Sequence, residues 1–552
     1  MRHGGKILID QLETQGASAV FTVPGESFLA ALDGLHDSNR MKTVICRQEG
    51  GASMMAEAWG KVKGQPGICM VTRGPGAANA MAGLHIAQQD STPMIMFLGL
   101  PGEKHEDREA FQEIETKALF GSFVKWAAVI RSTSRIPEYV SRAYHTAMNG
   151  RPGPVVLGLP EDMLSSIGDA ADAKPAHFAS PSASQSDEAA IVAAFAKAQR
   201  PLVIVGGPGW SRDVQKKVEA FADRFDLPVA AAFRFQDYID NRHRCYVGHA
   251  GIGLDAKLAD AIRNADLLLV IGARLGEMTT SGYTLVNIPN PTSYLIHVHP
   301  SGNELGSVYS PDLPINATAA SFADLLGRLP TPASKPWSAH RQALRESYEA
   351  YVKPHPTPGA VQLEQVVRTV SDMLPENGII TNGAGNYAAF VHRYTEYKGY
   401  KSCLAPTSGS MGYGLPAAIG AKIADPTRTV INFAGDGCFM MTSQELATAV
   451  QYGLDIVTVV VNNGMYGTIR AHQERQYPER ISGTTLVNPD FAAFARAFGA
   501  HGETVERTED FRPALERALA TRKAAVIEVK TDPEALTPRQ TLSEIRASGK
   551  KR

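Results

Sequence analysis

The chain has 552 residues, of which 44% are hydrophobic and 20% are charged, so it exceeds what one hydrophobic core usually supports, and about three domains are expected. The 55 Lys and Arg nearly cancel the 56 Asp and Glu, which leaves a net charge of −1 and does not favour nucleic acid or an anionic membrane as partner. We therefore expect a small-molecule ligand.

The cysteines and the first residues indicate a reducing compartment. Five cysteines are scattered without a Cys-x-x-Cys pair, which argues against a disulfide framework or structural zinc: Cys46, Cys69, Cys245, Cys403 and Cys438. The N-terminus, MRHGGKILIDQLETQG, enters an amphipathic helical pattern without a signal-type apolar core, and no run approaches the roughly 20 apolar residues of a membrane helix. We expect a cytoplasmic protein without a membrane partner.

Short apolar runs alternate with longer helical patterns along the chain. In chain order the predicted strands are VICRQ, GICMVT, MIMFLGL and VVLGLP, then LVIVGG, LPVAAA, LLLVIGA and SYLIHVH, then GIITNG, TVINFAGDG, IVTVVVNN and AAVIEVK. Stretches rich in Pro, Ala and Ser are predicted linkers, at residues 165–187, 330–340 and 352–359. The pattern predicts an α/β protein with three doubly wound parallel-sheet domains, over residues 1–165, 188–329 and 360–535.

The most informative segment is 429–470, where one strand ends in GDG (435–437) and the next ends in NNG (462–464). In a parallel sheet both strand ends lie at the edge where ligands gather, so the Asp436 carboxylate and the Asn463 amide oxygen can meet. Both are hard oxygen donors suited to Mg2+, and the adjoining helix N-terminus favours the negative charge of a diphosphate. The segment therefore predicts a metal and diphosphate site.

GDG, 24 intervening residues and then NN resembles the thiamine diphosphate motif shared by acetolactate synthases, pyruvate decarboxylases and benzoylformate decarboxylases. The resemblance implies that Asp436, Asn463 and the backbone carbonyl of Met465 bind Mg2+. It also implies further cofactor contacts, at Gly435, Gly437, Cys438, Gly467 and Asn386. GDG alone is weak evidence, because it is a common turn. Two further matches to the same family strengthen the resemblance.

The second match is APTSGSMGYGLPAAIGAK (405–422), which resembles the family segment that holds the pyrimidine and thiazolium rings. By this resemblance Met411 is the bulky apolar residue that bends the cofactor into a V. The Gly409 carbonyl would accept a hydrogen bond from the 4′-amino group. Without its glycine neighbours, Met411 would be interpreted as a core methionine.

The third match, VICRQEGGASMMAEAWGKVKG (44–64), resembles the family's pyrimidine-domain signature, and Glu49 falls on the essential glutamate. A carboxyl group hydrogen-bonded to the pyrimidine N1′ favours the imino tautomer, whose nitrogen is then the base for the reactive thiazolium carbon. Alone, Glu49 would be interpreted as a helix N-terminal carboxylate. Glu57 is predicted to be structural, because the family pattern places the glutamate before GGA.

The resemblance covers nearly the whole chain. It implies that the three blocks are, in order, a pyrimidine-binding, a central and a diphosphate-binding domain. In the family the first and third domains meet across a subunit interface. The resemblance therefore implies a homodimer or homotetramer with its active site between subunits, acting on a small 2-oxo acid.

The overall pattern is nearest to acetolactate synthase, as in EAFQE (109–113) and FVKW (123–126). By that likeness Gln112 and Lys125 lie near the reacting centre, while composition alone is equally consistent with surface residues. Glu26, in VPGES, stands near the place of a catalytic acid in pyruvate decarboxylases. It is either a second proton-transfer group or a helix-start carboxylate.

Three further positions depart from acetolactate synthase. Met278 replaces the arginine associated with the acceptor carboxylate, so selection of a second 2-oxo acid lacks a bidentate cation. His472 replaces the tryptophan that sorts acceptors; it is either a catalytic histidine or a loop histidine, and we expect the second. His299 stands where an acid is expected beside FAD, so FAD, which acetolactate synthases often hold without redox use, is left as an open and doubtful cofactor.

The sequence thus favours a thiamine diphosphate- and Mg2+-dependent carboligase, in which decarboxylation of a 2-oxo acid precedes addition to a second carbonyl. The alternative is a non-oxidative decarboxylase that releases an aldehyde, which Glu26 and Met278 favour. A dehydrogenase of three Rossmann-like domains is disfavoured, because the sequence has no intact GxGxxG with a downstream ribose acid. A binding protein without catalysis is disfavoured by Glu49, since a mere binder needs no proton switch.

Overall fold

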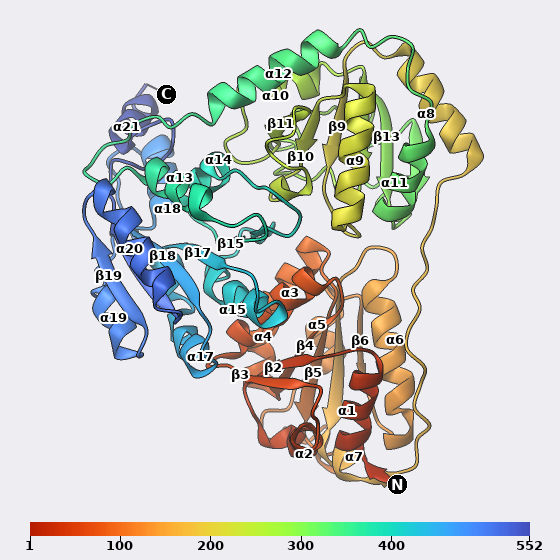
Figure 1. The fold of residues 1–552 in the computed structure, drawn as a ribbon. Coiled ribbons are helices and arrows are strands. Elements are labelled where there is room, and N and C mark those ends of the chain that lie inside the picture. Colours follow the sequence, from red (N-terminus) through yellow and green to blue (C-terminus); the bar gives the residue numbers. More distant parts are fainter. Residues whose placement is uncertain (552) are drawn as a thin grey trace.

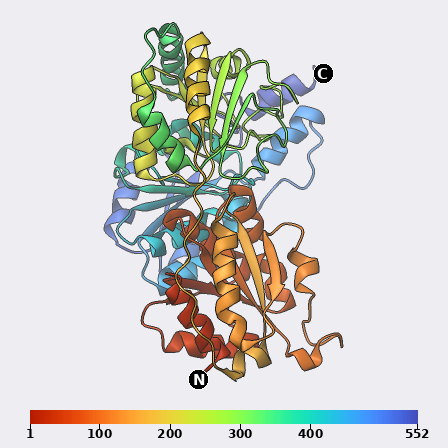
Figure 2. The ribbon, with the colours of Figure 1, turned by 90° about the vertical axis from the view of Figure 1, so that its right-hand side faces the viewer.

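The structure, a computed structural model, describes residues 1–551. Its main elements are three six-stranded sheets, in each of which all neighbouring strands are parallel and helices flank the sheet (Figure 1). The predicted α/β fold of three parallel-sheet domains is therefore confirmed. Figures 1 and 2 show the central domain above the first, with the linker after the first domain running along the outside of the molecule.

The first sheet has the strand order β3-β2-β4-β5-β7-β6. Its strands are β2 (Ala19–Thr22), β3 (Lys42–Ile45), β4 (Gly67–Thr72), β5 (Met94–Leu100), β6 (Trp126–Val129) and β7 (Pro154–Pro160). The helices are α1 (Gly4–Thr14), α2 (Leu29–His36), α3 (Glu49–Lys63), α4 (Gly74–Asp90), α5 (Thr116–Phe120), α6 (Ile136–Met148) and α7 (Glu161–Ser165). A separate antiparallel pair joins β1 (Arg2–His3) to β8 (Ile167–Gly168).

The central sheet has the order β11-β10-β9-β12-β13-β14. Its strands are β9 (Pro201–Val205), β10 (Val229–Ala231), β11 (Tyr246–His249), β12 (Leu267–Ile271), β13 (Tyr294–His299) and β14 (Leu313–Asn316). The helices of this part are α8 (Gln185–Lys197), α9 (Arg212–Phe225), α10 (Ala256–Arg263), α11 (Ala319–Arg328) and α12 (Ser338–Tyr351).

The third sheet has the order β16-β15-β17-β18-β20-β19. Its strands are β15 (Ile379–Asn382), β16 (Cys403–Leu404), β17 (Val430–Gly435), β18 (Ile456–Asn462), β19 (His501–Val505) and β20 (Ala525–Lys530). The helices are α13 (Leu363–Met373), α14 (Tyr387–Tyr394), α15 (Gly414–Ala424), α16 (Asp436–Met440), α17 (Leu446–Gln451), α18 (Gly467–Gln476), α19 (Phe491–Ala497), α20 (Thr508–Ala520) and α21 (Leu542–Gly549). The domain limits predicted from the linkers stay a prediction.

The twelve predicted strands are all present, but the sequence did not predict eight others. Seven of the eight lie outside the sheet centres, at sheet edges or in the separate pair: β1, β6, β8, β11, β14, β16 and β19. β19 is an edge strand of sequence HGETV, and a strand with one unpaired side needs few apolar residues. Only β2 is central and fully buried, and its four residues, AVFT, are too few for a periodic signal.

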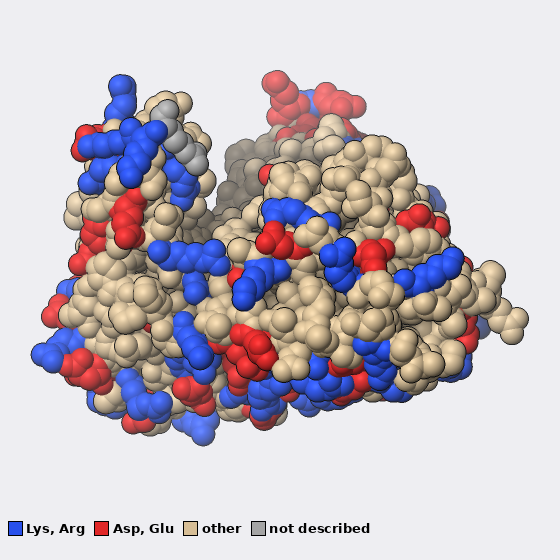
Figure 3. All heavy atoms as spheres, turned by 90° about the horizontal axis from the view of Figure 1, so that it is seen from above, with Lys and Arg blue, Asp and Glu red and all other residues tan. Residues whose placement is uncertain are grey.

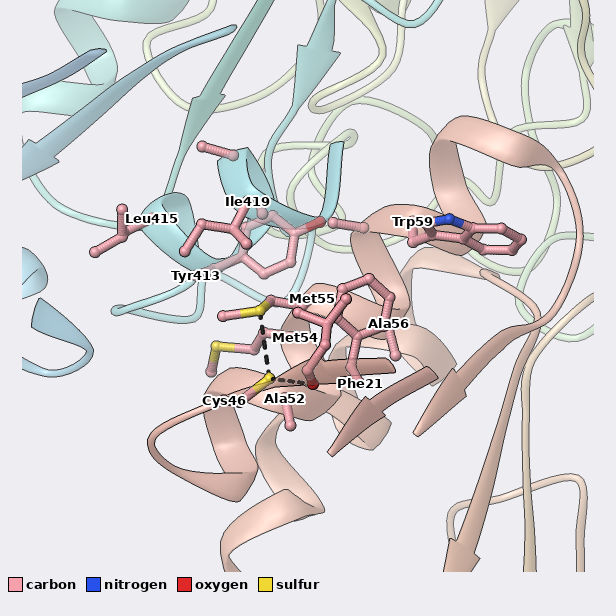
Figure 4. Close-up of a cluster of buried hydrophobic side chains, with 14 of the residues drawn as sticks. Phe21, Cys46, Ala52, Met54, Met55, Ala56, Trp59, Tyr413, Leu415 and Ile419 are labelled. Atoms are coloured by element: carbon pink, nitrogen blue, oxygen red, sulfur yellow. Dashed lines mark hydrogen bonds between the residues drawn. The ribbon is translucent and has the colours of Figure 1, made fainter. Parts of the chain in front are cut away.

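The first and third domains share one hydrophobic core, in which α3 packs against α15. Figure 4 shows Met55 of α3 beside Tyr413 and Ile419 of the third domain. A Cβ on Gly420 would collide with the Met55 carbonyl, so this glycine allows the two helices to approach closely. The α3–α15 contact therefore fixes the relative position of the two domains within one chain.

A buried ion cluster lies beside this contact. Lys61 Nζ is 2.5 Å from Asp90 Oδ2 and 3.1 Å from Glu57 Oε1, and Glu57 accepts a further hydrogen bond from the Tyr413 hydroxyl at 2.5 Å. Burial acts to lower the pKa of Lys61, but the two carboxylates outweigh it and raise the pKa. The expectation that Glu57 is structural is confirmed, because these contacts occupy its carboxylate in a buried position.

Replacing Lys61 with Met should lower the free energy of unfolding by about 3–5 kcal/mol, because it leaves two buried carboxylates without a cation. Urea denaturation, compared with wild type, measures this change. Lys63→Met is the matched control, since Lys63 is an exposed lysine of the same helix, and it should change stability by less than about 0.5 kcal/mol. Equal stability of the two variants would contradict the prediction.

Candidate active site at two sheet edges

Three neighbouring strands of the third sheet, β15, β17 and β18, end at the same edge, and α14, α16 and α18 begin there. Parallel strands followed by helices direct backbone N–H groups toward this edge, which favours an anion. The loops that follow β17 and β18 carry the predicted metal ligands. This edge is therefore the place where the chain can hold a diphosphate with its cation.

Asp436 is buried at this edge, with 3% exposure. Its Oδ1 accepts from the backbone N–H of Gly437 at 2.8 Å, and its Oδ2 accepts from the N–H of Gly464 at 2.9 Å and from Asn488 Nδ2 at 2.8 Å. Burial raises the pKa of Asp436, although these hydrogen bonds oppose the shift. A bound cation would favour the charged carboxylate, so the donor chemistry fits a metal.

Asn463 and Met465 lie in the loop that reaches Asp436. Asn463 Oδ1 accepts from the Met465 N–H at 3.2 Å, and Met465 is buried. Asn488 was not predicted, although its Nδ2 also donates to Asn462 Oδ1 at 3.0 Å and so ties this loop to Asp436. No local motif marks Asn488, because it meets Asp436 only through the fold.

Cys438 connects the GDG turn to the loop that carries Met411. Its Sγ accepts from the N–H of Gly412 at 3.2 Å and from the Tyr387 hydroxyl at 3.4 Å. Met411 is half-buried against the core of the third domain, whereas Gly409 has φ +67° and open space where a Cβ would stand. The two predicted segments, 405–422 and 435–437, are therefore brought together.

The remaining predicted glycines permit close packing at this edge. A Cβ on Gly467 would lie 2.5 Å from Asn386 Oδ1, which brings these two predicted residues into contact. A Cβ on Gly437 would lie 2.5 Å from the Tyr466 ring, and one on Gly435 would lie 3.0 Å from the Tyr387 ring. Larger side chains at these positions would require the loops to move apart.

Glu49 lies at the carboxyl edge of the first sheet, as the first residue of α3. The Gln48 side chain caps this helix by accepting from the Gly51 N–H at 3.1 Å. Glu49 is half-buried, and its Oε2 accepts from Asn79 Nδ2 at 2.9 Å. A Cβ on Gly76 would lie 3.4 Å from Glu49 Oε1, so the glycine turn after β4 passes beside the carboxylate.

Glu26 and Gln112 lie at the same edge of the first sheet. The Glu26 side chain is 69% exposed, and its Oε1 is 3.6 Å from Arg73 Nη1. The Gln112 carbonyl accepts from the Gly74 N–H at 2.9 Å, and Gln112 has φ +61°. Both residues therefore stand beside the turn that follows β4 and precedes Gly76.

Lys125 does not lie near this edge. Its N–H donates to the Pro154 carbonyl at 2.8 Å, at the start of β7, and its Nζ donates to the Asn149 carbonyl at 2.7 Å. Because β6 and β7 are parallel, their starts lie at the edge opposite to Glu49. The expectation that Lys125 lies near the reacting centre is therefore wrong, and burial lowers its pKa to about 8 in a site remote from Glu49.

Two departures from the acetolactate synthase pattern belong to the central domain. Met278 lines a cavity of about 450 Å3 together with Arg274 and Tyr283. His299 is buried, and burial lowers its pKa to about 4. His472 is exposed on the helix α18, so the interpretation of it as a loop histidine is wrong.

Within one chain the Glu49 carboxylate and the Asp436 loop are not joined by any hydrogen bond among residues 1–551. The third domain does contact the residues just before Glu49: Glu445 Oε1 accepts from the backbone N–H groups of Arg47 and Gln48, each at 3.0 Å. The two predicted halves of the site are thus both formed, but on separate sheet edges.

Three models of protein families match the sequence of this chain. Residues 2–119 match the model described as "Thiamine pyrophosphate enzyme, N-terminal TPP binding domain", residues 189–326 the central domain and residues 383–529 the C-terminal TPP binding domain of the same enzymes. The chain belongs to the thiamine pyrophosphate enzyme family. Thiamine pyrophosphate, also called thiamine diphosphate, is therefore its cofactor, with a divalent metal.

Curated relatives cover nearly the whole chain. The acetolactate synthase of Mycobacterium bovis is 30% identical over 545 residues, which are 95% of this chain and 87% of the relative. The acetolactate synthase large subunit of Lactococcus lactis is 29% identical (90% and 87%), and the acetolactate synthase isozyme 2 large subunit of Escherichia coli is 28% identical (96% and 96%). The predicted resemblance to this group of thiamine diphosphate enzymes is confirmed.

The comparisons do not support FAD. The three matched family descriptions name thiamine pyrophosphate alone, and the buried His299 occupies the position where an acid was expected. We therefore assign no role to FAD.

Two surface properties bear on the expected partners. In residues 1–551 no helix combines the length and the apolar character needed to cross a bilayer. Figure 3 shows Lys and Arg interspersed with Asp and Glu over the face seen from above, so this face does not carry one broad patch of a single sign.

Proposed function

We propose that this enzyme is a Mg2+-dependent carboligase that joins the acyl part of one 2-oxo acid to the carbonyl carbon of a second. In the balanced reaction, two 2-oxo acid anions and one proton give one 2-hydroxy-3-oxo acid anion and CO2. The proposal is carried by the meeting of Asp436, the Asn463 loop and the Met411 loop at one sheet edge, in a chain whose near full-length relatives are named acetolactate synthases.

The chain's own residues have distinct roles in this proposal. Asp436, Asn463 and the Met465 carbonyl hold the metal, and Met411 and the Gly409 carbonyl support the rings. Glu49 shares a proton with the pyrimidine N1′. When bound, thiamine diphosphate supplies the electron sink for cleavage of the carbon–carbon bond. Further contacts come from residues that pack at the same edge, Gly435, Gly437, Cys438, Gly467 and Asn386, and Gln112 and Glu26 lie on the substrate side.

Product analysis tests this function. Wild-type enzyme incubated with pyruvate, thiamine diphosphate and Mg2+ should release CO2 and form acetolactate, and an aryl 2-oxo acid tests the width of the donor site. An aldehyde as the only organic product would favour simple decarboxylation instead. That alternative is less well supported, because the relatives described above are named as synthases.

We also propose that each active site forms between two copies of the chain. Large apolar side chains are exposed around the metal edge of the third domain, at Met440, Met441, Ile469, Tyr477, Ile481 and Val487. Leu29 and Phe111 are exposed at the Glu49 edge of the first domain. Exposed apolar surface of this extent favours a protein contact, and a symmetric dimer would join the two edges twice.

Mixing two inactive variants tests this arrangement. A dimer of one Glu49→Gln chain and one Asp436→Asn chain contains one intact site and one doubly altered site, so equal mixing after dissociation should restore about a quarter of wild-type activity. If both residues of a site came from the same chain, mixing would restore nothing. Each variant mixed with itself is the control.

A further inference from the structure

Arg73 occupies an unusual position beside the Glu49 edge. It directly follows β4 and precedes α4, with φ 10° and ψ −156°, outside the regular helix and strand regions. Three residues later, Gly76 passes beside the Glu49 carboxylate. Arg73 therefore stands at the start of the glycine turn that passes beside the proposed proton switch.

The Arg73 guanidinium has partners for some, but not all, of its hydrogen-bond donors. Its side chain is 9% exposed, with Nη2 2.8 Å from Glu161 Oε2, Nη1 3.3 Å from the Phe111 carbonyl and Nη1 3.6 Å from Glu26 Oε1. Nε is buried and has no hydrogen-bond partner among the described residues. Only one of these contacts is short, so the guanidinium retains donors for another anion.

The two acidic partners of Arg73 are both exposed to solvent. The Glu26 side chain is 69% exposed and that of Glu161 is 41% exposed, so each can rotate into solvent at small cost. They keep the buried guanidinium paired in the free enzyme. An incoming carboxylate can take their place without leaving the arginine uncompensated.

A cavity gives access to this group. Its volume is about 420 Å3, and its lining includes Arg73, His105, Arg108 and Glu161 together with the apolar Pro101 and Phe111. Two further basic side chains thus face the same space as Arg73. The cavity combines cationic walls with an apolar side, which suits a small carboxylate that carries an alkyl or aryl group.

We propose that Arg73 binds the carboxylate of the acceptor 2-oxo acid, an inference that rests on the proposed carboligase function. Position 278 carries methionine, and Arg274, which lines the same central-domain cavity, is paired with Glu304 at 3.0 Å. The acceptor needs a cation to be selected over an uncharged aldehyde. Arg73 meets that need from the first domain. Arg73 thereby determines acceptor specificity, because it positions the carbonyl of the second 2-oxo acid. The loss of CO2 from the donor and the formation of the new carbon–carbon bond are those of the proposed carboligase reaction.

The test compares two acceptors with one donor. With pyruvate as donor, Arg73→Met should lower kcat/KM for a 2-oxo acid acceptor by about 10–100-fold, as expected for loss of charge-assisted hydrogen bonds. Addition to acetaldehyde, which has no carboxylate, and the CO2 release from the donor that accompanies this addition should stay within about threefold. Arg73→Lys should recover part of the loss, because it restores the charge without the bidentate geometry.

The controls separate this inference from the proposed function. Arg131→Met removes an exposed arginine of the same domain, paired with Glu106, and should leave both acceptors unaffected. Equal loss with both acceptors in Arg73→Met and Arg73→Lys, or no loss with either, would overturn the role of Arg73 while wild-type carboligation stands. Wild-type enzyme that releases no CO2 from a 2-oxo acid, or that yields only an aldehyde, would overturn the proposed function and the inference together.

Discussion

Replacing Asp436 with Asn should weaken the binding of thiamine diphosphate in the presence of Mg2+ by at least about 100-fold, with a matching loss of turnover. The reason is the loss of the one carboxylate among the three proposed metal ligands, since changes to second-layer partners of metal ligands alone cost roughly 10–100-fold. Isothermal titration at a fixed Mg2+ concentration measures the binding, and product formation measures the turnover.

The geometry around Asp436 makes this variant informative. Its oxygens accept hydrogen bonds from Gly437, Gly464 and Asn488, and burial raises its pKa, so the folded chain holds the carboxylate at a cost that a cation offsets. Removing divalent metal from wild type with a chelator should therefore reduce cofactor affinity by a similar factor. In the variant, chelation should add little, because both changes remove the same interaction.

Asp372→Asn is the matched control for this prediction. Asp372 is an exposed acid of the same domain, 3.7 Å from Arg368 across one helical turn. Its replacement should leave cofactor affinity unchanged. An Asp436→Asn variant that binds thiamine diphosphate as tightly as wild type would remove Asp436 from the metal site.

Replacing Glu49 with Gln should lower turnover by about 10²–10⁴-fold while cofactor affinity changes by less than about tenfold. Gln keeps the size of the side chain and an oxygen that can accept from Asn79, but it cannot exchange a proton with the pyrimidine nitrogen. Turnover with pyruvate and titration of the cofactor, measured on the same preparation, distinguish loss of chemistry from loss of binding.

The control for Glu49 is Glu138→Gln, at an exposed position on α6. This change should not affect turnover. If Glu49→Gln retained wild-type turnover, Glu49 would have no part in the reaction. If it lost cofactor binding and turnover in proportion, its role would be structural.

By itself the sequence determined the fold class and the cofactor, and it predicted the residues that hold this cofactor. The central strands are mainly apolar runs of three to seven residues, such as MIMFLGL and IVTVVVN, because burial on both faces of a parallel sheet favours apolar side chains. The oxygen donors and glycines directly follow those strands. Local pattern and strand-end geometry were therefore enough to predict that Asp436 and Asn463 share one edge.

Only the tertiary structure decided which distant side chains complete or leave the site. Asn488 is 52 residues from Asp436 and Asn79 is 30 residues from Glu49, so no local spacing marks either contact. Lys125 lies at the opposite edge because it directly precedes β6, and the start of a parallel strand is at the edge opposite to Glu49. The sequence did not predict β6, so it could not show at which edge Lys125 lies. Arg73 and its partners Glu26 and Glu161 follow three different strands, β4, β2 and β7. Such contacts depend on how strands are ordered in the sheet, and that order is a property of the whole domain rather than of any one segment.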